Sequence, residues 1–147
     1  MLAKISAFFQ SLSLPAEEEV DSLSVEMACT VLLCEVMKAD GHLDAQEQQI
    51  LTAMISTQFS LSPDEVRELI DQAIELSEHA IDFHQFTSKI NSHYSPKEKG
   101  HIVKLLWQLA MADGKVASIE EHIIRRIADL LHLSHAQYIE AKNTILP

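Results

Sequence analysis

Apolar residues recur along most of this chain at intervals of three and four positions, which is the period of an amphipathic α-helix. No segment alternates between apolar and polar residues with the period of two that a half-buried strand shows. The chain also has only 3 Gly and 4 Pro in 147 residues, which is few for a fold with many tight turns. The pattern therefore predicts an all-α protein with short connections and no sheet.

The predicted helices divide the chain into an N-terminal amphipathic helix, residues 1–14, and one helical domain, residues 22–147. The first helix of the domain, at about 22–39, is apolar on nearly every side, which is typical of a central, buried helix. The apolar side chains of the N-terminal helix are Leu2, Ile5, Phe8, Phe9 and Leu12. The other helices are expected to begin after Asp44 and to span about 63–78, 82–92, 96–112, 118–132 and 135–145.

Two of these helices have the same start signal, Ser-Pro-x-Glu, at residues 62–65 and 95–98. Serine is a preferred N-cap residue, and proline fits the first turn because its missing N–H would have no partner there. Glutamate three residues after the serine completes a capping box. We therefore expect helices to begin at Pro63 and Pro96.

The second half of the chain repeats the first with an offset of 73 residues. Residues 39–41 and 112–114 both read Ala-Asp-Gly, Leu43 corresponds to Val116, and Glu47 corresponds to Glu120. This correspondence predicts two three-helix repeats, at about residues 25–80 and about residues 96–147. Because neither repeat covers its own apolar face, we predict that they pack with pseudo-twofold symmetry into one compact bundle of about seven to eight helices.

The repeated motif, Asp-Gly-x-[Leu/Val]-x3-Glu, is explained in part as a turn between helices. Glycine permits the left-handed conformation that ends a helix, and the Leu or Val is an apolar anchor. In the first copy Asp44 can cap the next helix; the second copy has Ala117 there, so Ser118 is the expected substitute. Turn chemistry does not explain Asp40 and Asp113, since a carboxylate is unfavourable at the negative end of a helix dipole.

The two unexplained aspartates favour a second interpretation, in which the motif binds a divalent cation such as Ca²⁺. Its Asp, Gly and Glu fit positions five, six and twelve of an EF-hand loop. Positions one and three do not fit, because Val36 and Lys38 in the first copy cannot serve as ligands. One Asp and one Glu are too few for Ca²⁺, which takes six to eight oxygen ligands, so a strong site requires both turns to come together. Both interpretations stay open at this point.

Charge is distributed unevenly in this acidic chain, whose formal net charge is -11. Residues 1–73 contain 13 acidic and 3 basic side chains, whereas residues 74–147 contain 9 acidic and 8 basic. An acidic half disfavours nucleic acid and anionic lipid, because phosphate contacts need clustered Lys and Arg. It suits cations or a basic protein surface, and it also serves solubility.

Other residues with reactive side chains indicate no catalytic site. The sequence contains no P-loop, no G-x-S-x-G and no HExxH, and the histidine pairs at 79/84 and 132/135 are expected to be solvated or capping residues. Cys29 and Cys34 point about 140° apart around one helix, so we expect buried thiols in a reducing compartment. No stretch approaches the ~20 apolar residues needed to span a membrane.

The motif and its surroundings resemble the TerB-like domain of the tellurite-resistance proteins, in its stand-alone bacterial branch. The resemblance spans roughly residues 25–145 and rests on residues 39–47, 86–91, 106–120 and 126–131. It implies a compact helical bundle, no enzymatic activity and an acidic metal-binding cluster. It also implies a cytoplasmic location in bacteria, within stress-response complexes at or near the inner membrane.

The resemblance carries the metal-binding role to particular residues of this chain. They are Asp40, Asp44, Glu47, Asp113 and Glu120. Ala117 replaces the polar residue that is usual at this position in the family, which weakens any ligand role for the middle of the second loop. The chain is thus expected to be a non-enzymatic module that binds or senses a divalent cation and contacts other proteins. The alternative is a metal-free adaptor whose acidic half binds a basic partner.

The N-terminal helix has three candidate locations. It can dock on its own bundle, pair with a second copy in a homodimer, or lie on a membrane. Docking is the favoured interpretation, since a membrane-surface helix usually carries more basic residues than the single Lys4.

Overall fold

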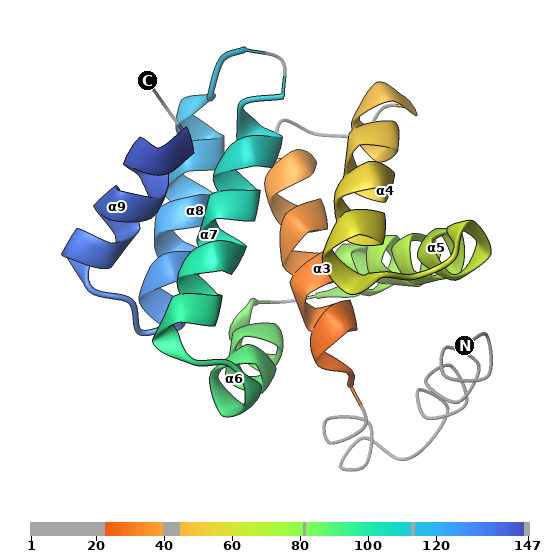
Figure 1. Ribbon diagram of the computed structural model, residues 1–147, viewed down its shortest axis with the longest axis horizontal. Helices are drawn as coiled ribbons and strands as arrows, with labels where there is room; N and C mark the ends of the chain where they lie inside the picture. Colours follow the sequence, from red (N-terminus) through yellow and green to blue (C-terminus); the bar gives the residue numbers. More distant parts are fainter. Residues whose placement is uncertain (1–22, 40–44, 81, 113, 146–147) are drawn as a thin grey trace.

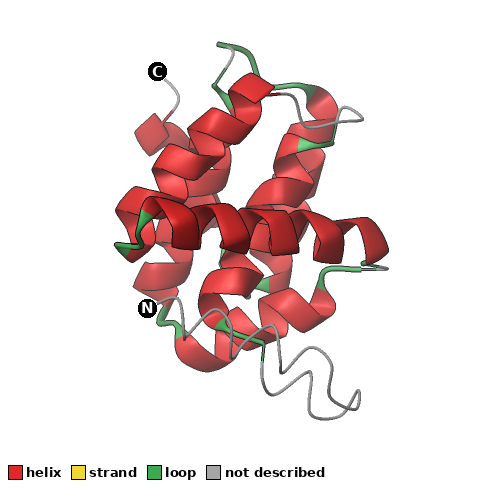
Figure 2. Ribbon diagram, turned by 90° about the vertical axis from the view of Figure 1, so that its right-hand side faces the viewer, coloured by secondary structure: helices red, strands yellow, loops and turns green. Residues whose placement is uncertain are grey.

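All the secondary structure in the described parts of the chain is helical, which confirms the predicted fold class. The structure is a computed structural model, and it describes residues 23–39, 45–80, 82–112 and 114–145. Figure 2 shows these residues as helices joined by short loops. The helix predicted within residues 1–14 lies outside the described residues. The described residues form seven helices, namely α3 (Val25–Met37), α4 (Ala45–Phe59), α5 (Pro63–His79), α6 (His84–His93), α7 (Pro96–Ala110), α8 (Ser118–Leu130) and α9 (His135–Ile145).

Helix α3 is the centre of the bundle. Ten of its 13 residues are buried, as its nearly uniform apolar sequence predicts. It packs against α4, α5, α6, α7 and α8, and Figure 1 shows it between α4 and α7, with α5 crossing at a large angle. Helix α9 covers the outer side of α7, where Trp107 is fully buried and its ring centroid lies 5.8 Å from that of Tyr138. Trp107 is therefore a core aromatic residue.

The predicted capping boxes form at both Ser-Pro-x-Glu sequences. The Ser62 N–H donates to Glu65 Oε1 at 3.0 Å, and the Ser95 N–H donates to Glu98 Oε1 at 2.8 Å. The predicted cap of α8 is wrong, because Ser118 is the first residue of the helix and Ala117 is the N-cap. Alanine has no hydroxyl group to accept a hydrogen bond, so only Glu120 contributes, by accepting the Ala117 N–H at 2.8 Å.

The junctions between α4 and α5 and between α8 and α9 have the same local geometry. Ser60 and His132 both have a positive φ, of 53° and 63°, and each is followed by Leu-Ser at the start of the next helix. Ser62 and Ser134 each accept a hydrogen bond from the backbone three residues later. The order of elements and these two turns agree with the repeat, whereas its pseudo-twofold symmetry stays a prediction.

Two polar side chains bind the C-terminal end of α8, a feature that the sequence did not predict. The ammonium group of the buried Lys99 donates to the carbonyl of Leu131 at 3.1 Å, and Asn91 Nδ2 donates to the carbonyl of Leu130 at 2.9 Å. Both carbonyls belong to the last turn, which has no intrahelical donors. The positive charge of Lys99 also stabilises the negative end of the helix dipole.

Candidate functional site

Two of the five predicted metal ligands, Glu47 and Glu120, line the same cleft. Glu47 lies in the first turn of α4 and Glu120 in the first turn of α8, and both side chains are half-buried. The cleft has a volume of about 320 Å³. Its other lining residues are Gln46, Ile50, Leu109, Ala110, Ala112, Lys115, Val116 and Ala117. The fold thus places on one cleft two glutamates that are 73 positions apart in the sequence.

The direction of the helices explains this proximity. The C-terminal ends of α3 and α7 and the N-terminal ends of α4 and α8 all lie at one end of the bundle, the top of Figure 1. Gly114, in the turn between α7 and α8, has a φ of 88°, the left-handed conformation that its sequence position predicted. Val116 is half-buried against the core, which confirms its role as an apolar anchor.

The other three predicted ligands, Asp40, Asp44 and Asp113, lie outside the described residues. Within the described ranges, no three or more His, Cys, Asp or Glu side chains form a group that could hold a metal ion. The cleft therefore contributes two carboxylates from described residues, and a larger shared cluster stays a prediction.

Lys115, a basic residue that the motif pattern does not include, lines the same cleft as Glu47 and Glu120. Each of these three residues takes part in polar interactions, so none is an unpaired charge. With one lysine and two glutamates, the residues that line the cleft have a net charge of -1. Lys115 directly follows Gly114, and a lysine is not a metal ligand, so the pattern of predicted ligands does not include it.

The structure confirms that the four histidines are exposed and the two cysteines buried, whereas the reducing compartment stays a prediction. The four histidines at positions 79, 84, 132 and 135 are all exposed, as expected for solvated residues. Cys29 and Cys34 are buried and form no disulfide. Burial raises the pKa of the Cys34 thiol to about 12 and also raises that of Cys29, so neither thiol is poised as a nucleophile.

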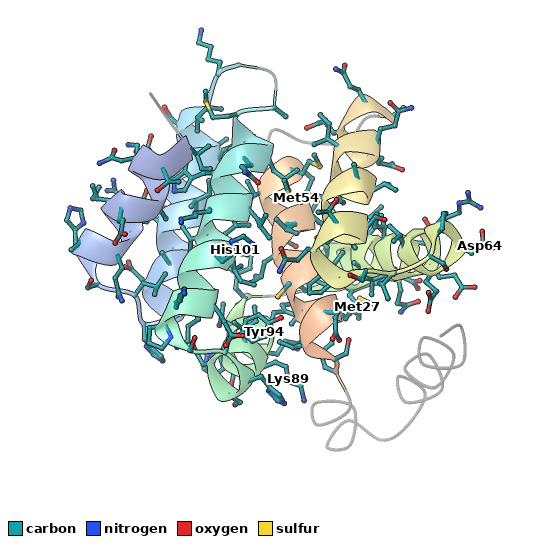
Figure 3. The ribbon with its side chains drawn as sticks, in the orientation of Figure 1. Met27, Met54, Asp64, Lys89, Tyr94 and His101 are labelled. Atoms are coloured by element: carbon teal, nitrogen blue, oxygen red, sulfur yellow. The ribbon has the colours of Figure 1, made fainter. Side chains whose placement is uncertain are left out.

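A larger cleft, of about 780 Å³, lies between α7 and α9. Lys97, His101 and Lys104 line it from α7, and Glu98 and Glu140 are also present. His101 Nε2 lies 2.9 Å from Gln58 Oε1, and Figure 3 shows this histidine on α7. The charges are mixed and the surface is open, which resembles an ordinary solvated face more than a selective site.

The described residues define a small all-helical bundle protein in which acidic residues from two motif copies lie at one end. This chain belongs to the TerB family: a family model described as tellurite resistance protein TerB matches residues 26–143, which is most of the chain. The resemblance seen in the sequence is thereby confirmed. No curated protein and no solved structure gives a significant match. In the described parts of the chain, no helix is both long and apolar enough to cross a bilayer.

Proposed function

We propose that this TerB-family chain is a non-enzymatic module that binds or senses a divalent cation at the cleft between α4 and the α7–α8 turn. The observation that carries this proposal is that Glu47 and Glu120, one from each motif copy, line the same cleft. In the cell the module would act in a cytoplasmic bacterial complex for tellurite or stress response, near the inner membrane. The description of the family as tellurite resistance protein TerB supports the tellurite-response part of this setting.

Ligand chemistry supports this assignment. Carboxylate oxygens are preferred ligands of hard divalent cations, and a second copy of the motif doubles the number available. Glu120 Oε1 already accepts the Ala117 N–H, so this oxygen would be shared with the helix cap and Oε2 would face the ion. Two glutamates do not saturate Ca²⁺, so the remaining oxygens would come from Asp40, Asp44, Asp113, backbone carbonyls and water. Such a site is expected to bind weakly, in the range of sensors rather than buffers.

Addition of a divalent cation is expected to raise the melting temperature of the protein. A free ion concentration ten times the Kd stabilises the folded state by about 1.4 kcal/mol. For a domain of this size, this raises the melting temperature by roughly 3–5 °C. Calorimetric titration with Ca²⁺, Mg²⁺, Mn²⁺ and Zn²⁺ gives the affinity and the preferred ion. Replacing Glu47 and Glu120 together with glutamine should reduce the affinity at least about tenfold, because both charged ligands are lost.

The double replacement Glu75→Gln and Glu140→Gln is the matched control, because both side chains are exposed and neither lines the cleft. It changes the net charge equally and should leave binding unchanged. The variants Asp40→Asn and Asp113→Asn test the two aspartates of the motif directly. An unchanged melting temperature at millimolar concentrations of all four ions would refute the proposal.

A second candidate function, a metal-free adaptor, is favoured by the outer face of α5. Five carboxylates, at positions 64, 68, 71, 75 and 78, recur every three or four residues along this helix, and four of the five side chains are exposed. Such spacing places them on one side of the helix. Figure 3 shows Asp64 at the end of α5 that projects from the bundle. Only Arg67, 3.7 Å from Asp64, forms an ion pair on this face among the described residues. A basic protein surface would fit this stripe.

The adaptor is expected to capture a basic partner in a salt-sensitive way. Reversing the charge at Asp71, Glu75 and Glu78 should weaken capture at least about tenfold, because several attractive pairs become repulsive. Pull-down at two salt concentrations measures this effect, with Glu140→Lys as the control. Glu65 lies on the same helix but is fully buried, so it is not part of this surface. Capture that does not respond to salt or to the reversals would exclude the adaptor function.

A further inference from the structure

Lys115 is the only basic residue among the described residues that line the cleft between α4 and the α7–α8 turn. The other ionisable residues of this lining are Glu47, in the first turn of α4, and Glu120, in the first turn of α8. All three residues take part in polar interactions. The cleft has a volume of about 320 Å³, so one positive charge shares a small space with the two carboxylates that a cation needs.

The backbone around Lys115 is fixed, whereas its side chain is exposed. Gly114, just before it, has a φ of 88°, and the Gly114 N–H donates to the carbonyl of Met111 at 2.8 Å. Val116, just after it, is half-buried against the core. Lys115 itself is exposed, and a lysine carries its ammonium group on a flexible four-carbon stem. The ammonium group can therefore enter or leave the cleft without movement of the turn.

An ammonium group and a divalent cation are attracted to the same carboxylate oxygens. A protonated lysine has three donors and no acceptor, so it cannot be a ligand of a cation and can only compete with one. Because Lys115 is tethered to the turn, its ammonium group stays near the carboxylates at about millimolar effective concentration. The remaining described residues of the lining are uncharged, so none of them compensates the charge of the glutamates in this way.

We propose that Lys115 is the internal counter-ion of this cleft and sets its cation affinity by competing for Glu47 and Glu120. This inference rests on the proposed cation site and adds the residue that keeps the site weak. In the ion-free protein the ammonium group offsets part of the charge of the two glutamates. An incoming ion displaces it toward solvent, which leaves two carboxylates to face the two positive charges of the ion.

Calorimetric titration of the full-length protein with Ca²⁺, Mg²⁺ and Mn²⁺ at constant ionic strength tests this proposal. Lys115→Met removes the charge and adds no oxygen ligand. It should tighten binding about fivefold, because a unit charge within about 8 Å of a divalent ion in water-like surroundings changes the affinity by that factor. Lys115→Arg keeps the charge and should gain no affinity. Lys104→Met is the matched control, since Lys104 lines the other cleft and its loss changes the net charge equally.

A second measurement, made in the presence of a chelator, does not depend on ion binding. Lys115→Met should lower the melting temperature of the ion-free protein by about 1–2 °C, the usual effect of losing an exposed ion pair in a domain of this size. The same substitution should have no effect when Glu47 and Glu120 are both replaced with glutamine, because the charges that it compensates are then absent. A merely structural role of Lys115 would lower the melting temperature in both backgrounds.

The two proposals fail in different ways. Equal or weaker ion binding by Lys115→Met would overturn the counter-ion role and leave the cation site standing. Equal losses of melting temperature in the two backgrounds would overturn it as well. Ion binding by Lys115→Met alone would support the counter-ion role, and would show that the unmodified protein does not bind the ion by itself. Binding by neither protein would refute the cation site and the counter-ion role together.

Discussion

Replacing Glu65 with lysine is expected to destabilise the protein by about 4 kcal/mol or more, enough to unfold much of the population of an ordinary domain. Glu65 is fully buried at the start of α5, where its Oε1 accepts the Ser62 N–H at 3.0 Å. Lysine removes this acceptor and places a positive charge at the positive end of the helix dipole. It also buries an ammonium group without an anionic partner, and breaking a buried polar arrangement in this way costs about 3–5 kcal/mol.

The equivalent residue in α7 provides the control for this experiment. Glu98 makes the same capping box with Ser95, but its side chain is exposed. Glu98→Lys should therefore cost only about 1 kcal/mol, the usual value of a lost cap. Chemical denaturation followed by circular dichroism measures both free energies of unfolding. Similar losses for the two substitutions would show that burial of Glu65 contributes nothing beyond the local motif.

Truncation of the only tryptophan, Trp107→Ala, is expected to cost about 3–5 kcal/mol and to lower the melting temperature by roughly 10 °C or more. The side chain is fully buried in α7, where it contacts Tyr138 of α9 and lies 5.3 Å from the ammonium group of Lys142. Its loss leaves a cavity at the centre of the interface between α7 and α9. Thermal unfolding followed by circular dichroism measures the change, since the variant lacks the fluorescent residue.

Trp107→Phe separates packing from hydrogen bonding at this position. Trp107 Nε1 is buried and has no hydrogen-bond partner among the described residues, so phenylalanine sacrifices no polar contact. It should cost about 1–2 kcal/mol, as a smaller aromatic ring that still fills most of the space. Should Trp107→Phe be as damaging as Trp107→Ala, the indole N–H would have a partner that the packing argument does not include.

The helices themselves follow from the sequence because their determinants are local. Pro63 and Pro96 begin helices as predicted, and the nearly uniform apolar segment of residues 25–37 forms the central helix. Capping and periodicity involve residues three or four positions apart, so neighbouring letters suffice. The predicted N-cap at Ser118 is wrong, because Ala117 is the N-cap although it has no hydroxyl group. Half of the capping box, the hydrogen bond from the Ala117 N–H to Glu120, forms without one.

The candidate site could be predicted only in part. The sequence identified Glu47 and Glu120 as corresponding residues of a repeat, but their position on one cleft depends on how α4 packs near α7 and α8. It did not identify Lys115, because a lysine is neither a ligand nor part of the repeat. Asp40, Asp44 and Asp113, the other predicted ligands, lie outside the described residues, so their role stays a prediction.

By itself, the sequence determined the fold class, the helix starts, the buried central helix and the TerB family, since each depends on local spacing or on a motif of fixed length. Only the tertiary structure decided which equivalent residues differ in environment. Glu65 is buried and Glu98 is exposed in identical capping boxes, because the third residue of α5 faces the bundle and the third residue of α7 faces solvent. The same packing brings the two motif glutamates to one cleft. Burial and proximity depend on contacts between residues distant in sequence, which local patterns do not encode.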